Sequence, residues 1–281
     1  MDATLLGGPG GISLFVRCIV PDTPWASLVL LHGSMVHSEY YLPVALALAE
    51  AGVATFLPDL RGHGRSDGLR AHVAEFQHHV DDARSVLAYV RDVLDVPAHL
   101  GGESYGGLIA FLAAAGVPAA EAPASLVLAA PAFALKAQVP PRLRRSLRLV
   151  GQAVPALRLP VYMHLTGVSR KPDLDRLAAR DPLLNRQYTI GFFCELLRAQ
   201  EAAMNVARDV RVPCLALIGG DDRVTDNEGT RAVLARTAHS RIRLYPDFLH
   251  AVLSEDVPAV RRDIVAFLGA DATSHRLPAA P

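Results

Sequence analysis

The middle of the chain reads His99-Leu100-Gly101-Gly102-Glu103-Ser104-Tyr105-Gly106-Gly107-Leu108, and this stretch decides the fold. A short apolar run is followed by the pattern G-x-S-x-G and then by an apolar run with helical character. This order predicts a strand, a sharp turn and a helix whose N-terminus faces the serine oxygen. The glycines are needed because a Cβ atom would clash at such a turn. The sequence therefore predicts Ser104 as a nucleophile.

A second copy of the pattern, Gly64-Arg65-Ser66-Asp67-Gly68, has a different context. It sits inside the polar, glycine-rich stretch Asp59–Arg70, and no helix-like run follows it. Because the strand–turn–helix order is missing, Ser66 is predicted to be a loop residue rather than a nucleophile.

Short apolar runs alternate with segments of helical period along most of the chain. Runs of this kind suit strands buried on both faces of a parallel sheet, and the alternation predicts an α/β fold with helices on both faces. An early antiparallel strand is expected at Ile12–Ile19. The other predicted strands are Ser27–Leu31, Val53–Leu57, Ala98–Leu100, Ser125–Ala129, Cys214–Ile218 and Arg241–Tyr245. The predicted helices are Leu42–Ala51, Phe76–Leu94, Ser104–Val117, Thr230–Ala238 and Val257–Leu268.

Residues 132–208 interrupt this alternation. The segment has several prolines and no clear strand, so it reads as helical or irregular, and it is too long for a loop without structure of its own. We expect an insertion on top of the sheet, which divides the chain into a core of residues 1–131 and 209–281 and an inserted segment of residues 132–208. The tail after about residue 269 is expected to fray.

A serine hydroxyl needs a base, which is itself oriented by an acid, and in this arrangement the chain order is serine, acid, histidine. Of the histidines after Ser104, His250 follows the last predicted strand through a short loop and precedes the last helix, so we predict it as the base. The other three are His164 in the insertion, His239 at the end of a predicted helix, and His275 in the tail.

The acid is expected after the strand Cys214–Ile218. Asp221 and Asp222 have the right spacing, and sequence physics does not separate them. Asp226, slightly further along, fits a helix N-cap better.

Backbone N–H groups are expected to bind the oxyanion that develops during acyl transfer. One is the N–H of Tyr105, directly after the nucleophile. The second is assigned to Ser34 in the loop His32-Gly33-Ser34-Met35, with Met35 as the fallback. His32 is interpreted as a structural hydrogen-bonding residue.

Composition excludes several other classes of protein. The chain has 281 residues, with 28 Lys+Arg balanced by 28 Asp+Glu, which argues against nucleic-acid binding. The three cysteines are far apart and are expected to be reduced, buried side chains without metal or disulfide spacing. The cluster His78-His79-Val80-Asp81-Asp82 is interpreted as a solvated helix face rather than a metal site. No metal or cofactor is expected.

The N-terminal residues carry no basic stretch ahead of an apolar run, so they do not resemble a secretory signal. We therefore expect a cytoplasmic protein, with peripheral membrane contact as a further hypothesis.

With these residues in place, roughly residues 12–268 resemble the α/β-hydrolase superfamily, and within it the monoacylglycerol lipase and lysophospholipase group. The blocks that carry the resemblance are Leu31-His32-Gly33-Ser34, Asp59–Gly68, Gly102–Gly107 and Gly219-Gly220-Asp221-Asp222-Arg223-Val224. The resemblance implies an α/β-hydrolase fold with a mostly parallel sheet and a mainly helical cap inserted after the sixth strand. It also implies that the block holding Ser66 is structural and that Asp222 is the acid. Met35 and Tyr105 depart from the family pattern, which commonly has Gly and Met there.

The resemblance implies hydrolysis of a lipid ester through an acyl-enzyme on Ser104, with a monoacylglycerol as the leading substrate. A lysophospholipase, a short-chain carboxylesterase or thioesterase, and a ligand-binding protein that keeps the fold without catalysis are the alternatives.

The positive charge is unevenly distributed, because the stretch from Ala122 to Pro172 has eight basic residues and no acidic one. Apolar and basic residues alternate from Leu143 to Val150. Such a helix can lie on a lipid surface; alternatively, it packs its leucines on the core and leaves its arginines in water.

Overall fold

The computed structural model describes residues 2–137, 140–162 and 167–274 of the chain. An eight-stranded sheet has the order β1-β2-β4-β3-β5-β6-β9-β10, with antiparallel pairing of β1 with β2 and of β2 with β4 and parallel pairing elsewhere. The strands are β1 (Asp2–Gly8), β2 (Ile12–Ile19), β3 (Ala26–Leu31), β4 (Val53–Pro58), β5 (Ala98–Glu103), β6 (Leu126–Ala129), β9 (Cys214–Gly219) and β10 (Ser240–Tyr245).

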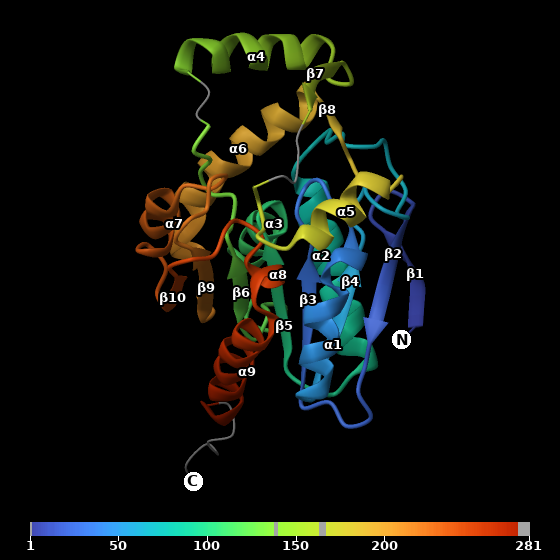
Figure 1. Cartoon of the computed structure of the whole chain (residues 1–281), viewed down its shortest axis with the longest axis vertical. Helices are drawn as coiled ribbons and strands as arrows, with labels where there is room; N and C mark the ends of the chain where they lie inside the picture. The colour runs from blue at the N-terminus through green and yellow to red at the C-terminus, as the bar shows by residue number, and fades with distance from the viewer. Residues whose placement is uncertain (1, 138–139, 163–166, 275–281) are drawn as a thin grey trace.

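Helices cover both faces of this sheet (Figure 1). Helices α2 and α3 pack together on one face, and α1 packs with α9 on the other. The helices outside the insertion are α1 (Leu42–Glu50), α2 (Gln77–Val93), α3 (Tyr105–Ala114), α7 (Asn227–Leu234), α8 (Val252–Glu255) and α9 (Val257–Ser274). The predicted α/β architecture with helices on both faces is confirmed.

The central strands are buried along their whole length. Every residue of β3, β4, β5, β6 and β9 is buried, as expected for parallel strands covered on both faces. The edge strand β10 is mostly exposed or half-buried. Because parallel strands end at the same edge, the loops after β3, β5, β9 and β10 all meet there.

The structure corrects two details of the predicted elements. Residues 2–8, for which no strand was predicted, form the edge strand β1 by pairing with β2, and residues 9–11 make the turn between the two strands. Helix α9 continues to Ser274, six residues past the predicted end, because Gly269 is followed by alanine-rich sequence without a proline. The tail residues 275–281, including His275, lie outside the described residues.

The insertion lies between β6 and β9 and stands above the carboxyl edge of the sheet (Figure 1). It contains α4 (Pro141–Ala153), β7 (Arg158–Tyr162), α5 (Pro172–Arg180), β8 (Gln187–Thr189) and α6 (Ile190–Val206). The prediction that it holds no strand is wrong, since β7 and β8 pair antiparallel. Pro160 inside β7 and the irregular register explain why the sequence signal is weak.

Helix α4 leaves apolar side chains in solvent. Leu149 is 61% exposed, Leu143 is 56% exposed and Val150 is 43% exposed. The alternative in which this helix packs its leucines on the core is therefore wrong for these positions. Arg142 and Arg145 are exposed on the same helix.

The glycine at position 106 sets a close approach on which the fold of the nucleophile turn depends. A Cβ atom there would lie 2.4 Å from the carbonyl oxygen of Leu31. We predict that Gly106→Ala lowers the free energy of unfolding by about 2 kcal/mol or more, because a backbone oxygen cannot move aside. Urea denaturation measures this change. Gly7→Ala is the matched control, since nothing lies within 4 Å of its added Cβ; equal effects of the two substitutions would contradict the prediction.

Candidate active site

Ser104 occupies the turn between β5 and α3 in a left-handed backbone conformation, with φ 55° and ψ −113°. A non-glycine residue is strained there and holds this conformation only when its surroundings enforce it. Gly102 and Gly106 are required on either side of it. A Cβ at Gly102 would lie 2.4 Å from the carbonyl carbon of Gly106, so the turn closes too tightly for any side chain.

Ser66 lies in a different setting. Its hydroxyl donates to the carbonyl oxygen of Asp59 at 2.6 Å and accepts from the backbone N–H of Phe15 at 2.9 Å. The side chain is buried and joins a loop to β2. Because the hydroxyl already donates one hydrogen bond and accepts another within the protein, Ser66 has a structural role.

Asp222 and His250 come together at the carboxyl edge of the sheet. His250 Nδ1 lies 2.9 Å from Asp222 Oδ2, and Asp222 is fully buried. The carboxylate also accepts from the N–H groups of Val224 and Thr225 and from the hydroxyl of Thr225. Burial raises the pKa of Asp222, but the contact with His250 and these other hydrogen bonds outweigh it and hold the pKa below its usual value.

The other candidate acids and bases lie elsewhere. The side chain of Asp221 is 54% exposed and pairs with Arg170 at 2.9 Å. Asp226 caps α7 by accepting from the N–H of Glu228, as its sequence position predicts. His239 is exposed, and His164 lies outside the described residues. Of the two adjacent aspartates that sequence physics left open, Asp222 is the one in contact with His250.

The loop after β3 approaches the nucleophile from the other side. A Cβ at Gly33 would lie 3.8 Å from Ser104 Cβ, so the loop backbone is next to the serine. Ser34 directly follows Gly33 in this loop, and Tyr105 directly follows Ser104 at the start of α3. Backbone N–H groups are the kind of donor that an oxyanion requires.

His32 supports this loop. Burial lowers the pKa of its imidazole to about 3, which keeps the ring neutral. Its Nε2 accepts from the N–H of Leu60 at 2.9 Å, and its Nδ1 therefore donates to the carbonyl oxygen of Gly33 at 2.7 Å. The structural role predicted for His32 is confirmed.

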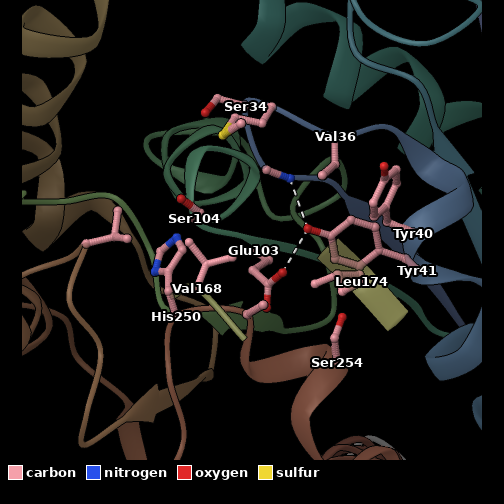
Figure 2. A pocket seen from close by; sticks show the side chains of 14 residues that line it. Ser34, Val36, Tyr40, Tyr41, Glu103, Ser104, Val168, Leu174, His250 and Ser254 are labelled. Atoms are coloured by element: carbon pink, nitrogen blue, oxygen red, sulfur yellow. Dashed lines mark hydrogen bonds between the residues drawn. The ribbon is translucent and has the colours of Figure 1, made fainter. Parts of the chain in front are cut away.

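A chamber of about 100 Å³ opens beside the serine. Ser104 and His250 lie next to each other on its wall, with Tyr41 and Glu103 nearby (Figure 2). Most of the lining is apolar, and the inserted segment contributes Val168 and Leu174. No sequence pattern pointed to these two residues, because their position depends on how the insertion folds back over the core.

A second, larger cavity of about 630 Å³ lies between α4 and α6. Its apolar lining residues are Phe133, Ala134, Leu135, Ala137, Leu143, Leu147, Leu159, Phe193, Leu196 and Leu197.

The cluster at the start of α2 is buried in part where a solvated face was predicted, and His78 and Asp81 are half-buried. His79 is fully buried and packs edge-on against the Tyr105 ring at 5.5 Å, and the buried Asp82 pairs with Arg61. The prediction failed because the loop that carries Arg61 covers this face of the helix. Within the described ranges, no group of three or more His, Cys, Asp or Glu side chains could hold a metal ion.

Cys194 and Cys214 are buried and Cys18 is half-buried, all three as free thiols. No helix in the described part of the chain is both long and apolar enough to cross a membrane.

A mostly parallel sheet with a serine on a strained strand-to-helix turn, followed by an aspartate–histidine pair after its last strands, defines an α/β hydrolase. A family model described as serine aminopeptidase, S33, matches residues 22–257. The chain belongs to this family of α/β hydrolases.

Its relatives include lipases. The chain is 30% identical over 254 residues to a monoacylglycerol lipase of Mycolicibacterium smegmatis, covering 88% of this chain and 89% of that one. It is 30% identical to the monoglyceride lipase of Homo sapiens, covering 94% and 88%. The crystal structure of Paleococcus ferrophilus monoacylglycerol lipase has a TM-score of 0.80 at 25% identity, covering 92% of this chain and 99% of that one.

The lowered pKa of Asp222 predicts a pH-dependent stability. A carboxyl whose folded pKa is depressed stabilises the fold fully above its ordinary pKa of 3.8, and this contribution is lost as the pH falls through the folded value. The destabilisation caused by Asp222→Asn should therefore stay constant from neutral pH down to about pH 4 and shrink as the pH falls further. Urea unfolding at several pH values measures it. The exposed neighbour Asp221→Asn should change stability by less than about 0.5 kcal/mol throughout; a gap between wild type and Asp222→Asn that stays constant with pH would count against the assignment.

Proposed function

We propose that this carboxylic ester hydrolase cleaves monoacylglycerols through an acyl-enzyme formed on Ser104. In this mechanism His250 takes the proton of the serine hydroxyl as Ser104 attacks the ester carbonyl. Asp222 orients the imidazole and stabilises its charged form. The backbone N–H groups of Ser34 and Tyr105 bind the oxyanion. The ester C–O bond then breaks, and His250 gives its proton to the departing glycerol oxygen. Water, deprotonated by His250, next attacks the acyl-enzyme, and the fatty acid leaves as Ser104 regains its proton.

The observation that carries the proposal is the buried contact of His250 with Asp222 beside a strained serine. A protein that only binds a ligand has little need for a buried carboxylate, an imidazole and a serine in this relation. The lipase relatives favour an ester substrate with one acyl chain.

We propose that residues 132–208 act as a cap over the core formed by residues 1–131 and 209–281. The large apolar cavity between α4 and α6 suits a fatty acyl chain, since burying its methylene groups is favourable by about 0.8 kcal/mol each. The smaller chamber beside Ser104 is of a size for a short alcohol. This division favours a substrate with one long chain and one small alcohol.

We further propose that α4 brings the protein into transient contact with a lipid surface. Its exposed Leu149 and Val150 lie on the same helix as the exposed Arg142 and Arg145. Apolar side chains that stay in water beside basic ones suit an interface of anionic lipid.

The substitution Ser104→Ala should remove ester hydrolysis, with a loss of about 10⁴-fold or more in kcat, because no other group can form the acyl-enzyme. The measurement is release of fatty acid from monoacylglycerols, lysophospholipids and short-chain esters side by side. Monoacylglycerols should give the highest kcat/KM; a preference for lysophospholipids or short esters would replace the proposed substrate while leaving the mechanism intact.

Ser66→Ala is the matched control, since it alters the other G-x-S-x-G copy. This variant should keep its turnover per folded molecule, although it loses two buried hydrogen bonds. Ser104→Ala retaining near wild-type turnover would refute the mechanism.

Binding to vesicles tests the lipid contact. Arg145→Gln should weaken binding to phosphatidylserine-containing vesicles roughly fivefold, which corresponds to about 1 kcal/mol per basic residue. Added salt should also weaken binding of the wild type, because it screens the attraction between the arginines and the anionic lipid. Leu149→Glu should abolish binding. Leu5→Glu, on the edge strand β1 and 66% exposed, is the control and should bind as wild type does. Absence of wild-type binding at low salt would remove this part of the proposal.

A further inference from the structure

Three segments of the site are joined by one chain of hydrogen bonds through Glu103, and Figure 2 shows the part of it that runs through Tyr41. The N–H of Gly33 donates to the hydroxyl oxygen of Tyr41 at 3.0 Å, and that hydroxyl donates to Glu103 Oε2 at 2.8 Å. The other carboxylate oxygen, Oε1, accepts from the N–H of Leu253 at 2.9 Å. Glu103 is therefore bonded at both oxygens.

The direction of every bond in this chain is fixed by chemistry. A backbone N–H can only donate, so Gly33 and Leu253 are donors. The Tyr41 oxygen accepts from Gly33, which sends its single proton toward Glu103. Both oxygens of Glu103 then accept, as the two oxygens of an ionised carboxylate do. Burial raises the pKa of Glu103 above its usual value, and the N–H of Leu253, the charge of His250 and the hydroxyl of Tyr41 offset part of that rise.

The residues joined by this chain of hydrogen bonds are close in sequence to the three groups that an acyl-transfer site needs. Gly33 precedes Ser34, which carries one of the two proposed oxyanion N–H groups. Glu103 precedes Ser104 itself. Leu253 follows His250 by three residues, at the start of α8. A shift at any of these backbone positions would misplace an oxyanion donor, the nucleophile or the base.

Burial makes this chain of hydrogen bonds rigid. Tyr41 is 3% exposed, Glu103 is 5% exposed and Leu253 is 1% exposed, so water cannot readily replace a lost link. An unpaired polar group in such a place is costly, which favours one geometry over looser ones.

Glu103 is not placed to act as the acid beside His250. The imidazole Nδ1 is taken by Asp222 Oδ2, and both oxygens of Glu103 face other donors. Its influence must pass through the residues it holds.

We propose that Glu103 and Tyr41 are positioning residues that fix the oxyanion loop and the base loop relative to Ser104. This inference rests on the proposed function, because it assigns what the pair does for acyl transfer at that serine. The pair strengthens transition-state binding rather than ground-state binding, since the N–H of Ser34 matters only once charge develops on the carbonyl oxygen.

Two single substitutions break the chain with little change in volume. Glu103→Gln offers one acceptor oxygen, so either its NH2 group faces the N–H of Leu253, or the Tyr41 hydroxyl must turn its proton away and accept from that group. Tyr41→Phe removes the middle link and leaves the N–H of Gly33 unpaired. Tyr245→Phe is the matched control, because Tyr245 is another buried tyrosine that donates to a carboxylate, that of Asp263 on α9 at 2.7 Å, and this bond lies outside the hydrogen-bond chain through Glu103.

The experiment measures kcat and KM on a soluble short-chain ester, normalised to the serine reactive toward a fluorophosphonate, together with inhibition by an alkylboronic acid. We expect kcat to fall between about 5-fold and about 100-fold in both variants, up to the loss that removal of a whole oxyanion donor causes. KM should change less than about twofold, and inhibition by the boronic acid, which forms a tetrahedral anion on the serine, should weaken in parallel with kcat. The double variant should lose no more than the worse single variant, because both break one chain.

An unchanged kcat in both folded variants, a loss confined to KM, or losses that multiply in the double variant would each overturn the inference. Thermal unfolding shows which variants are folded, and Tyr41→Phe alone decides the question if Glu103→Gln does not fold. Wild-type turnover that does not depend on Ser104 would instead refute the proposed function. The two failures are thus distinguishable.

Discussion

The left-handed backbone at Ser104 is the constraint on which the rest of the site depends. A residue with a side chain is strained by about 1–3 kcal/mol in such a conformation, so neighbouring contacts must hold it. The N–H of Ser104 donates to Ala129 at 2.8 Å, and its carbonyl oxygen accepts from Ala132 at 2.9 Å and from Leu108 at 3.1 Å. These bonds tie the turn to β6 and to the first turn of α3. The serine side chain consequently stands at the carboxyl edge of the sheet, where loops from other strands can reach it.

Buried polar groups then arrange those loops around the serine. Asp222 is buried away from water, and its carboxylate accepts hydrogen bonds from His250, Thr225 and Val224. The bond to Nδ1 of His250 fixes the orientation of the imidazole ring. His32 and Tyr41 hold the loop after β3 through the two backbone polar groups of Gly33. Each group is satisfied inside the protein, so the arrangement forms before a substrate arrives. Preorganised dipoles of this kind are the largest source of catalytic power in many enzymes.

The central strands, and the loops that carry the candidate site residues, could be predicted from the sequence because both depend on patterns within short stretches of sequence. The strands β3, β4, β5, β6 and β9 are short apolar runs between turn residues, and the order strand–glycine–serine–glycine–helix has few other uses. Contacts between distant segments were not predictable in the same way. His79 was assigned to solvent because helical spacing says nothing of the loop that buries it, and Glu103 gave no signal because its partners, Tyr41 and Leu253, lie 62 and 150 residues away in the chain. The choice of Asp222 over Asp221 needed the family resemblance, because the backbone conformation decides which of two adjacent aspartate side chains points toward His250, and the sequence does not reveal that conformation.

The central claim is that one serine, held at the strained turn, forms the covalent intermediate of this ester hydrolase. Peptide mapping by mass spectrometry after reaction with a fluorophosphonate tests it most directly, because the probe bonds only to an activated serine. The account predicts a single adduct on Ser104, with turnover lost in proportion to labelling, and no adduct on Ser66. Complete loss of activity with the adduct on another serine, or full activity after Ser104 has been labelled, would contradict it.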